Sequence, residues 1–185
     1  MNTIFRYFFD ACVGSWQTER TYHDLAYQSV ERSRTEFTIA PIATDLKIKV
    51  LKDNHYPIPD LVDELLGFQL GFHTVSETGE EVSQELRMLF VIREEENGVL
   101  VGDYLRDRAY EEARPIVSQF QFDIAQRELL MTTRYTRTVS IDSITLINPE
   151  LRIRKILNYR RPPEGEALKQ VSLVGFGVEQ KVISN

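Results

Sequence analysis

Ten short β-rich runs dominate this chain and limit the folds that it can adopt. Within most of them apolar or β-branched residues alternate with polar ones, a two-residue period that is typical of strands with one buried face. The runs cover residues 20–29, 36–42, 46–51, 84–92, 99–105, 116–124, 128–139, 143–147, 151–159 and 171–183. Turn signals separate several of them, such as Asn97-Gly98, Asn148-Pro149 and Pro162-Pro163.

This spacing predicts a mainly β protein whose antiparallel sheet closes into a barrel or a sandwich, because the long crossover helices of a parallel fold are missing. Two short helices are expected in the first third of the chain. Residues Thr3 to Val13 repeat apolar side chains at spacings of three and four, up to Gly14. A second helix fits Pro59 to Leu66. No repeat or linker interrupts residues 1–185, so we expect a single domain.

The composition argues against several broad classes of protein. The formal net charge of −6 disfavours nucleic acid as a partner, because phosphate contacts need clustered Lys and Arg. No stretch approaches the roughly 18–20 apolar residues that cross a bilayer, so neither a membrane span nor a signal peptide is expected. The single cysteine, Cys12, cannot form an intramolecular disulfide, which fits a reducing, cytoplasmic-type compartment.

Familiar catalytic and metal-binding signatures are also missing from the sequence. It contains no Gly-rich phosphate loop, no Gly-x-Ser-x-Gly elbow and no His-Glu-x-x-His helix. His23, His55 and His73 lack ligand-like spacing, so we expect no metal site and no prosthetic group. Cys12 falls on the apolar face of the first helix, where a buried and inert thiol is expected.

The basic side chains are unevenly distributed and biased toward Arg. Residues 1–100 carry a net charge of −8 and residues 101–185 a net charge of +2, and the chain has 16 Arg against 6 Lys. Because the planar guanidinium grips carboxylates and phosphates, this bias is a weak indication of an anionic ligand. Ordinary surface arginines are the alternative.

Two groups of residues remain as candidates for a site. In the run after the first helix, Trp16, Arg20 and Tyr22 share one strand face, which could equally be packing at a barrel rim. Near the C-terminus, Arg152 and Arg154 lie two apart in a strand and therefore point to the same side. Either they face water, or both guanidiniums enter a barrel and bind carboxylates of a ligand.

Three ordered motifs resemble those of the S-type phycobiliprotein chromophore lyases, the CpcS/CpeS family. They are Gly-x-Trp-x-x-x-Arg-Thr-x-His at residues 14–23, Leu-Arg-Asp-Arg-Ala-Tyr-Glu-Glu at residues 105–112 and Asn-Pro-x-Leu-Arg-x-Arg at residues 148–154. The resemblance implies a lipocalin-like, ten-stranded antiparallel barrel that binds an open-chain tetrapyrrole (bilin), such as phycocyanobilin or phycoerythrobilin, as its substrate. It also implies that the bilin is delivered to a cysteine of a phycobiliprotein α or β subunit, where a thioether forms.

The resemblance assigns roles to individual residues. Asp142 matches the family's acidic residue, which would contact the pyrrole nitrogens and favour a protonated, electrophilic bilin. The substrate-binding residues that it implies are Arg20, Arg152 and Arg154 for the propionates, Trp16 and Tyr135 for stacking, and His23, which matches the family's histidine. Packing in the core is the alternative for the two aromatic residues, and a structural role in the first strand is the alternative for His23.

The same resemblance implies a setting and partners: a cyanobacterial cytoplasm or a plastid stroma, and a homodimer or a heterodimer with a paralogous lyase subunit. The chain departs from the family pattern at Asp142, where Glu is usual, and at Thr145, Leu146 and Glu150. A Trp-containing stretch is replaced by residues 67–72. These differences keep two alternatives open: a non-catalytic bilin carrier or partner subunit like the CpcU-type proteins, and a lipocalin-like binder of another amphipathic carboxylate such as a fatty acid.

Overall fold

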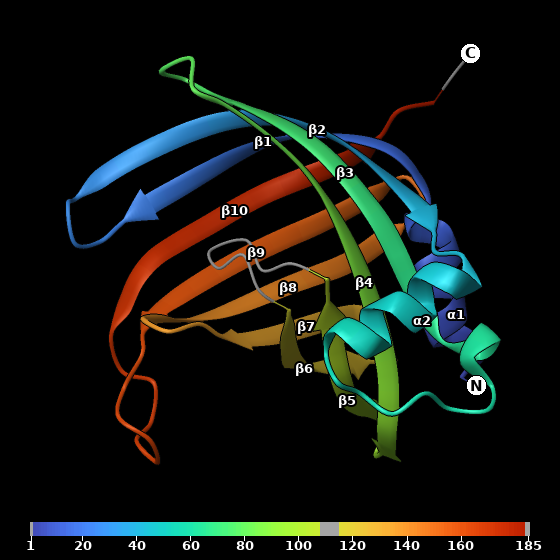
Figure 1. Ribbon diagram of the computed structural model, residues 1–185. Helices are drawn as coiled ribbons and strands as arrows, with labels where there is room; N and C mark the ends of the chain where they lie inside the picture. Colours follow the sequence, from blue (N-terminus) through green and yellow to red (C-terminus); the bar gives the residue numbers. More distant parts are fainter. Residues whose placement is uncertain (1, 108–114, 184–185) are drawn as a thin grey trace.

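The computed structural model describes residues 2–107 and 115–183, which form a closed antiparallel barrel with two helices (Figure 1). The strands are β1 (Gly14–Asp24), β2 (Ser29–Pro41), β3 (Leu66–Ser76), β4 (Glu81–Glu96), β5 (Val99–Arg106), β6 (Ile116–Asp123), β7 (Glu128–Arg134), β8 (Thr138–Asn148), β9 (Leu151–Arg160) and β10 (Val171–Lys181). Each strand pairs with its neighbours in sequence, and β1 closes the ring by pairing with β10. The predicted ten-stranded barrel is confirmed.

Strand register determines which side chains enter the barrel. Trp16 of β1 lies opposite Phe37 of β2, and both are buried inside, whereas the residues between the inward positions face outward. The same alternation is clear in β6, where every second side chain is buried. Because a one-residue shift would reverse every side chain, the buried face holds the register of each strand in place.

Helix α1 (Thr3–Cys12) closes one end of the barrel. Asn2 caps it, since its Oδ1 accepts hydrogen bonds from the backbone N–H groups of Ile4 at 3.0 Å and Phe5 at 3.2 Å. The rings of Phe5, Phe8 and Phe9 point into the barrel; the Phe5 ring centroid lies 4.9 Å from that of Phe122. Each fully buried Phe contributes roughly 2–3 kcal/mol, so this aromatic cluster anchors the helix in the closed end.

Helix α2 (Thr44–Asp53) corrects one prediction, because residues 46–51 were expected to form a strand. Leu, Lys, Ile, Lys and Val alternate there, but Val50 and Leu51 also fit a helix whose apolar stripe faces the barrel. They pack on Leu89 and Leu105, which point outward from β4 and β5. Packing of Val50 and Leu51 on this outer apolar patch, formed by Leu89 and Leu105, overrides the strand-like pattern of the sequence, as tertiary packing often does for short runs.

The second predicted helix is also wrong. Within residues 59–66 the structure has a single 3₁₀ turn, η1 (Val62–Glu64), and Leu66 already begins β3. Strand β3 was missed because its glycines weaken the strand signal. Gly67 is required there, since a Cβ atom at that position would lie 2.3 Å from the carbonyl oxygen of Met88 on β4. The predicted run 128–139 is divided between β7 and β8.

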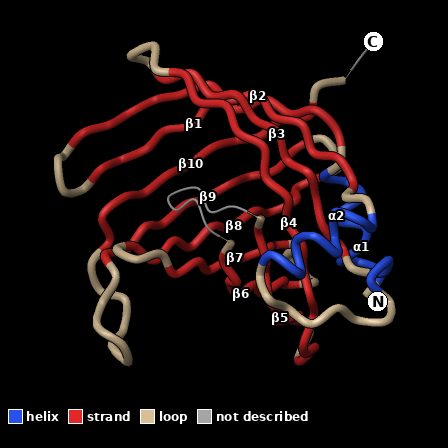
Figure 2. Tube along the Cα trace, viewed as in Figure 1, coloured by secondary structure: helices blue, strands red, loops and turns tan. Residues whose placement is uncertain are grey.

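Figure 2 shows how strongly strands dominate the fold, with the helical segments near one end of the barrel. Over the described ranges, none of these helices is long and apolar enough to cross a membrane. The end that α1 fills is called the closed end below, and the opposite end, where β1 turns into β2 and β3 turns into β4, is called the open end.

Candidate functional site

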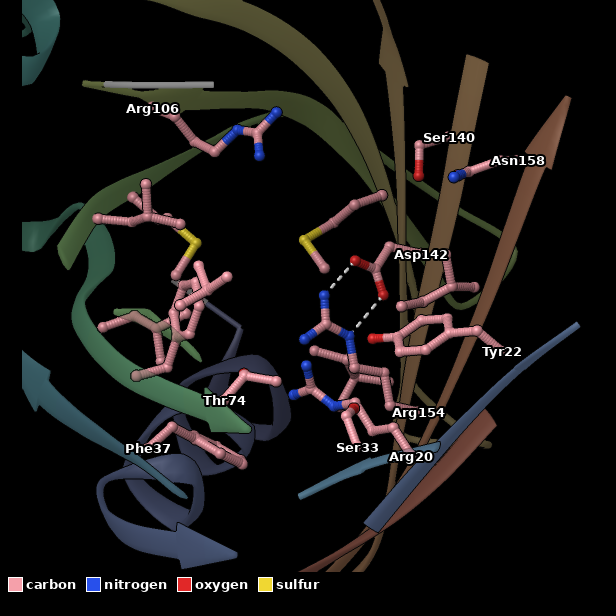
Figure 3. Close-up of a pocket in the computed structure, with 18 of the residues that line it drawn as sticks. Arg20, Tyr22, Ser33, Phe37, Thr74, Arg106, Ser140, Asp142, Arg154 and Asn158 are labelled. Carbon is pink, nitrogen blue, oxygen red and sulfur yellow. Dashed lines mark hydrogen bonds and ion pairs between the residues drawn. The ribbon is translucent and has the colours of Figure 1, made fainter. Parts of the chain in front are cut away.

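A cavity of about 500 Å³ occupies the barrel interior above the aromatic cluster of the closed end. One side is mostly apolar and is formed by β2, β3 and β4, with Phe37, Phe68 and Met88 among its side chains. The other side carries charged and polar groups of β1, β8 and β9. Figure 3 shows Asp142, Arg154 and Arg20 gathered there, across the cavity from Phe37. The cavity therefore suits an amphipathic ligand with a flat apolar body and anionic groups.

Asp142 and Arg154, which we call the wall pair, form a two-point ion pair on the polar side of this cavity. Arg154 donates from Nε to Oδ1 of Asp142 at 2.8 Å and from Nη2 to Oδ2 at 2.5 Å. They come from adjacent strands, since Arg154 on β9 lies opposite Ile144 and Asp142 is the next inward residue of β8. Burial alone would lower the pKa of Arg154, but Asp142 outweighs it and raises that pKa. Both side chains keep about a quarter of their surface exposed, at 24% and 21%.

Two further ion pairs lie deeper and share one carboxylate, and we call their residues the floor network: Glu179, Arg152 and Arg20. Glu179 of β10 is fully buried opposite Arg152 of β9, which donates from Nε to Oε2 at 2.8 Å. Arg20 of β1 donates to Oε1 at 3.3 Å. Burial opposes ionisation of Glu179, but the neighbouring guanidiniums, with Arg152 the strongest, outweigh it and lower the pKa of this carboxyl.

Sequence reasoning missed Glu179, although a signal was present. Gly175, Gly177 and Glu179 are the buried positions of β10, while Phe176 and Val178 point outward and remain 49% and 40% exposed. The strand is thus inverted relative to the usual pattern of apolar side chains inside. Over residues 175–179, the inward glycines and the one carboxylate provide room and a counter-ion for large cationic side chains on the neighbouring strands.

Trp16 lies beneath the cavity and is not among the residues that line it. Its indole Nε1–H donates to the backbone oxygen of Cys12 at 2.8 Å, and its ring stacks on Phe37. The Arg152 guanidinium lies 4.5 Å from the Trp16 ring centroid, within cation–π range. In this structure Trp16 therefore supports the floor network, and its predicted stacking against a ligand stays untested.

Tyr135 and Arg106 line the cavity away from the wall pair. Arg106, the last residue of β5, donates from Nη2 to the Tyr135 hydroxyl at 2.8 Å. Both side chains are buried, at 7% and 5% exposed. Tyr135 therefore lies at the cavity, and its stacking against a ligand stays a prediction. Arg106 belongs to one of the three motifs, but the sequence did not indicate that it points into the barrel.

His23 is not brought to the cavity. It follows Tyr22 in β1, and because Tyr22 lines the cavity, alternation places His23 on the exposed outer face. The lone thiol is sealed away as expected: Cys12 is 0% exposed. Burial raises the pKa of the Cys12 thiol, and the nearby Arg152 offsets only part of that rise. Among residues 2–107 and 115–183, no group of His, Cys, Asp and Glu could hold a metal ion.

Comparison with known proteins adds a separate line of support. A family model described as CpeS-like protein matches residues 5–182. The chain is 60% identical over 184 residues to chromophore lyase CpcS/CpeS 1 of Synechococcus sp., covering 98% of this chain and 100% of that protein. It is 27% identical to chromophore lyase CpcS/CpeS 2 of Synechocystis sp., covering 80% and 76%. The solved structure of the S-type phycobiliprotein lyase CPES from Guillardia theta has the same fold, with a TM-score of 0.76 at 19% identity over 97% and 93% of the two chains.

Proposed function

This chain belongs to the CpeS-like family and is a chromophore lyase, and we propose that it loads a bilin from its barrel cavity onto a phycobiliprotein subunit. The thiol of the acceptor cysteine adds across a carbon–carbon double bond at one end of the bilin. A C–S bond forms, the thiol proton passes to the bilin, and no group leaves. The 60% identity to a chromophore lyase along the whole chain is the observation that carries this proposal.

Asp142 is the proposed acid that contacts the pyrrole nitrogens. Each of its oxygens accepts one hydrogen bond from Arg154, and a carboxylate has about four lone-pair sites, so it retains capacity to accept pyrrole N–H groups. Its exposed surface lies in the cavity, where a low dielectric strengthens such contacts. A carboxylate held beside the pyrroles favours their protonated, more electrophilic form.

The charge balance of the cavity supports a ligand with two carboxylates. Within residues 2–107 and 115–183, four arginines line it: Arg20, Arg106, Arg152 and Arg154. Inside the barrel they face the carboxylates Asp142 and Glu179, whereas Glu31 and Glu80 lie at the exposed rim of the open end. A bilin carries two propionates, so its binding would bring the interior close to neutrality.

The remaining contribution of the protein is positioning. The apolar side of the cavity offers Phe37, Phe68 and Met88 to the conjugated plane, and a closed barrel shields a reactive bilin from water and from side reactions. The reacting thiol comes from the acceptor, since Cys12 lies behind the floor network and is fully buried. We expect the exchange to occur at the open end, with the chain acting as a homodimer or a heterodimer in a cyanobacterial cytoplasm or a plastid stroma.

Coexpression tests this function. The chain is produced with bilin-synthesis enzymes and a panel of apo-phycobiliprotein α and β subunits, and covalent colour is measured on denatured subunits. Colour above the control without lyase is expected for at least one pair of bilin and subunit. Absence of such colour across several bilins and subunits would exclude activity of the lone chain.

A partner-subunit role is the second candidate. A relative that is 22% identical over 80% of this chain is named as a subunit, the phycocyanobilin lyase subunit CpcS of Picosynechococcus sp.. Attachment that requires a coexpressed paralogue would favour this role, whereas attachment by the lone chain would exclude it. Titration with phycocyanobilin separates both candidates from a binder of other carboxylates, since that binder would cause no visible spectral change.

A further inference from the structure

Arg106 differs from the other cavity arginines in having no acidic partner in the part of the chain that the structure describes. Arg20 and Arg152 pair with Glu179, and Arg154 pairs with Asp142. For Arg106, the structure shows no ion pair with any carboxylate of residues 2–107 and 115–183. Figure 3 shows its guanidinium inside the cavity and apart from the wall pair.

The surroundings of Arg106 hold the guanidinium in place without neutralising it. Its Nη2 donates to the Tyr135 hydroxyl at 2.8 Å, and its Cζ lies 5.3 Å from the Tyr104 ring centroid and 5.7 Å from that of Tyr135. Its backbone oxygen accepts a hydrogen bond from the Asn54 side chain at 3.0 Å, which fixes the end of β5. The ring contacts and the phenol orient the side chain, so little conformational entropy would be lost on binding an anion.

A donor of this guanidinium is left unused. Arg106 Nε is buried and has no hydrogen-bond partner among the described residues. A buried charge without a counter-ion is costly, and an unsatisfied buried N–H adds to that cost. Arg152 avoids the cost of an uncompensated charge by pairing with Glu179, and Arg20, whose Nε is likewise without a partner, keeps the same carboxylate as a counter-ion. An arginine that binds an anionic ligand carries this energetic cost in the free protein, and the cost is removed when the ligand binds.

We propose that Arg106 is the receptor for one carboxylate of the bound ligand, a propionate of the bilin. This assignment rests on the proposed function and makes it more specific. It divides the cavity into two anchoring points: the wall pair for the pyrrole nitrogens, and Arg106 for a propionate. The predicted propionate partners Arg20 and Arg152 share the single carboxylate of Glu179 and are therefore partly compensated, which makes them weaker candidates than Arg106.

The test compares the affinities of two proteins for two ligands, so that the effect of removing the guanidinium can be compared with the effect of removing the carboxylates. Purified wild-type protein and Arg106→Gln are titrated with phycocyanobilin and with its dimethyl ester, which keeps the chromophore and lacks both carboxylates. For wild-type protein we expect tighter binding of the diacid. Arg106→Gln should weaken diacid binding about 10- to 100-fold and leave ester binding unchanged. Arg106→Lys keeps the charge but not the planar guanidinium, so its affinity for the diacid should lie between those of the wild type and Arg106→Gln.

The controls separate the possible failures. Arg34→Gln removes a 73% exposed guanidinium from the outer face of β2 and should change neither affinity. Unchanged ester binding by Arg106→Gln shows that the variant is folded. An equal loss for diacid and ester, or no loss for either, overturns the assignment of Arg106 and leaves the proposed function standing. Wild-type protein that binds neither form overturns the proposed function, and the assignment with it.

Discussion

The floor network and the wall pair use the same chemistry, an arginine held by a carboxylate, in two different environments. In the floor network, Glu179 is fully buried and Arg152 nearly so. In the wall pair, Asp142 and Arg154 each keep about a quarter of their surface open to the cavity. A fully buried pair is held by its surroundings and does not exchange its hydrogen-bond partners, whereas a partly exposed pair can share its donors and acceptors with a ligand. The difference shows that depth in the barrel, and not residue type, determines whether such a pair keeps surface open to the cavity.

One strand supplies both arginines. Arg152 and Arg154 are successive inward residues of β9, and Arg152 is closer to the closed end. Glu179 lies directly opposite Arg152, and Asp142 reaches Arg154 from the strand on the other side. A step of two residues along a strand, about 6.6 Å, is therefore enough to take a guanidinium from a sealed ion pair at the bottom of the cavity to an ion pair that is open to the cavity.

The largest effect is expected from Glu179→Gln, which removes the buried charge and keeps the shape of the side chain. Arg152 would keep its charge in the core and lose its counter-ion, a change that typically costs about 3–5 kcal/mol. Because Gln can still accept a hydrogen bond from Arg152, we expect the free energy of unfolding to fall by about 3 kcal/mol. Urea denaturation measures this change.

Glu19→Gln is the matched control for that variant. Glu19 accepts from Arg34 at 3.1 Å on the outer face, where the two side chains are 81% and 73% exposed. Exposed pairs contribute about 0–1 kcal/mol, so little change in unfolding free energy is expected. Equal losses for the two variants would contradict a special role for the floor network.

Protonation of Glu179 at low pH should also destabilise the protein. The pKa of Glu179 is lowered in the folded state, so the stability that its ionised form contributes is present above the unfolded pKa of about 4.3. That stability is lost as the pH falls through the lower folded pKa. We therefore expect the unfolding free energy of the wild type to drop below about pH 4.3, and more steeply than that of Glu179→Gln. Parallel curves for the two proteins would count against this assignment.

Asp142→Asn should have a smaller effect on stability and a selective effect on chemistry. Asn keeps one oxygen to accept from Arg154, and the open wall pair is already partly solvated. Loss of the acid should slow bilin attachment by about 10²-fold, within the range for a general acid or base, while bilin affinity changes much less. Attachment rates and spectral titration on the same preparation check this, and equal losses in both would contradict the acid role.

Much of the fold could be predicted from the sequence, because a two-residue period over ten runs permits few architectures. The exceptions were segments whose structure depends on distant partners. Residues 46–51 became helical on the outer patch of β4 and β5, and β3 formed despite its glycines because β2 and β4 lie on either side of it.

The site was harder to predict than the fold. Arg20, Arg152, Arg154, Asp142 and Tyr135 all line the cavity, and their roles toward a ligand stay predictions. Which acid faces which arginine depends on strand register, and this is why Glu179 went unnoticed. Local spacing also does not show that Arg106 points into the barrel. Nor does it show that no carboxylate of the described residues pairs with Arg106.

The smallest effect is expected from Cys12→Ala, a change in the residue that lies against the floor network. Trp16 donates to the backbone oxygen of Cys12, so that hydrogen bond survives the substitution. Loss of one buried sulfur should lower the unfolding free energy by about 1 kcal/mol. Attachment should stay at the wild-type level in the coexpression assay, because the bilin is transferred to a cysteine of the acceptor. Since the variant lyase has no thiol, any thioether-linked colour must reside on the acceptor, whereas a folded variant without activity would show that Cys12 itself takes part in the transfer.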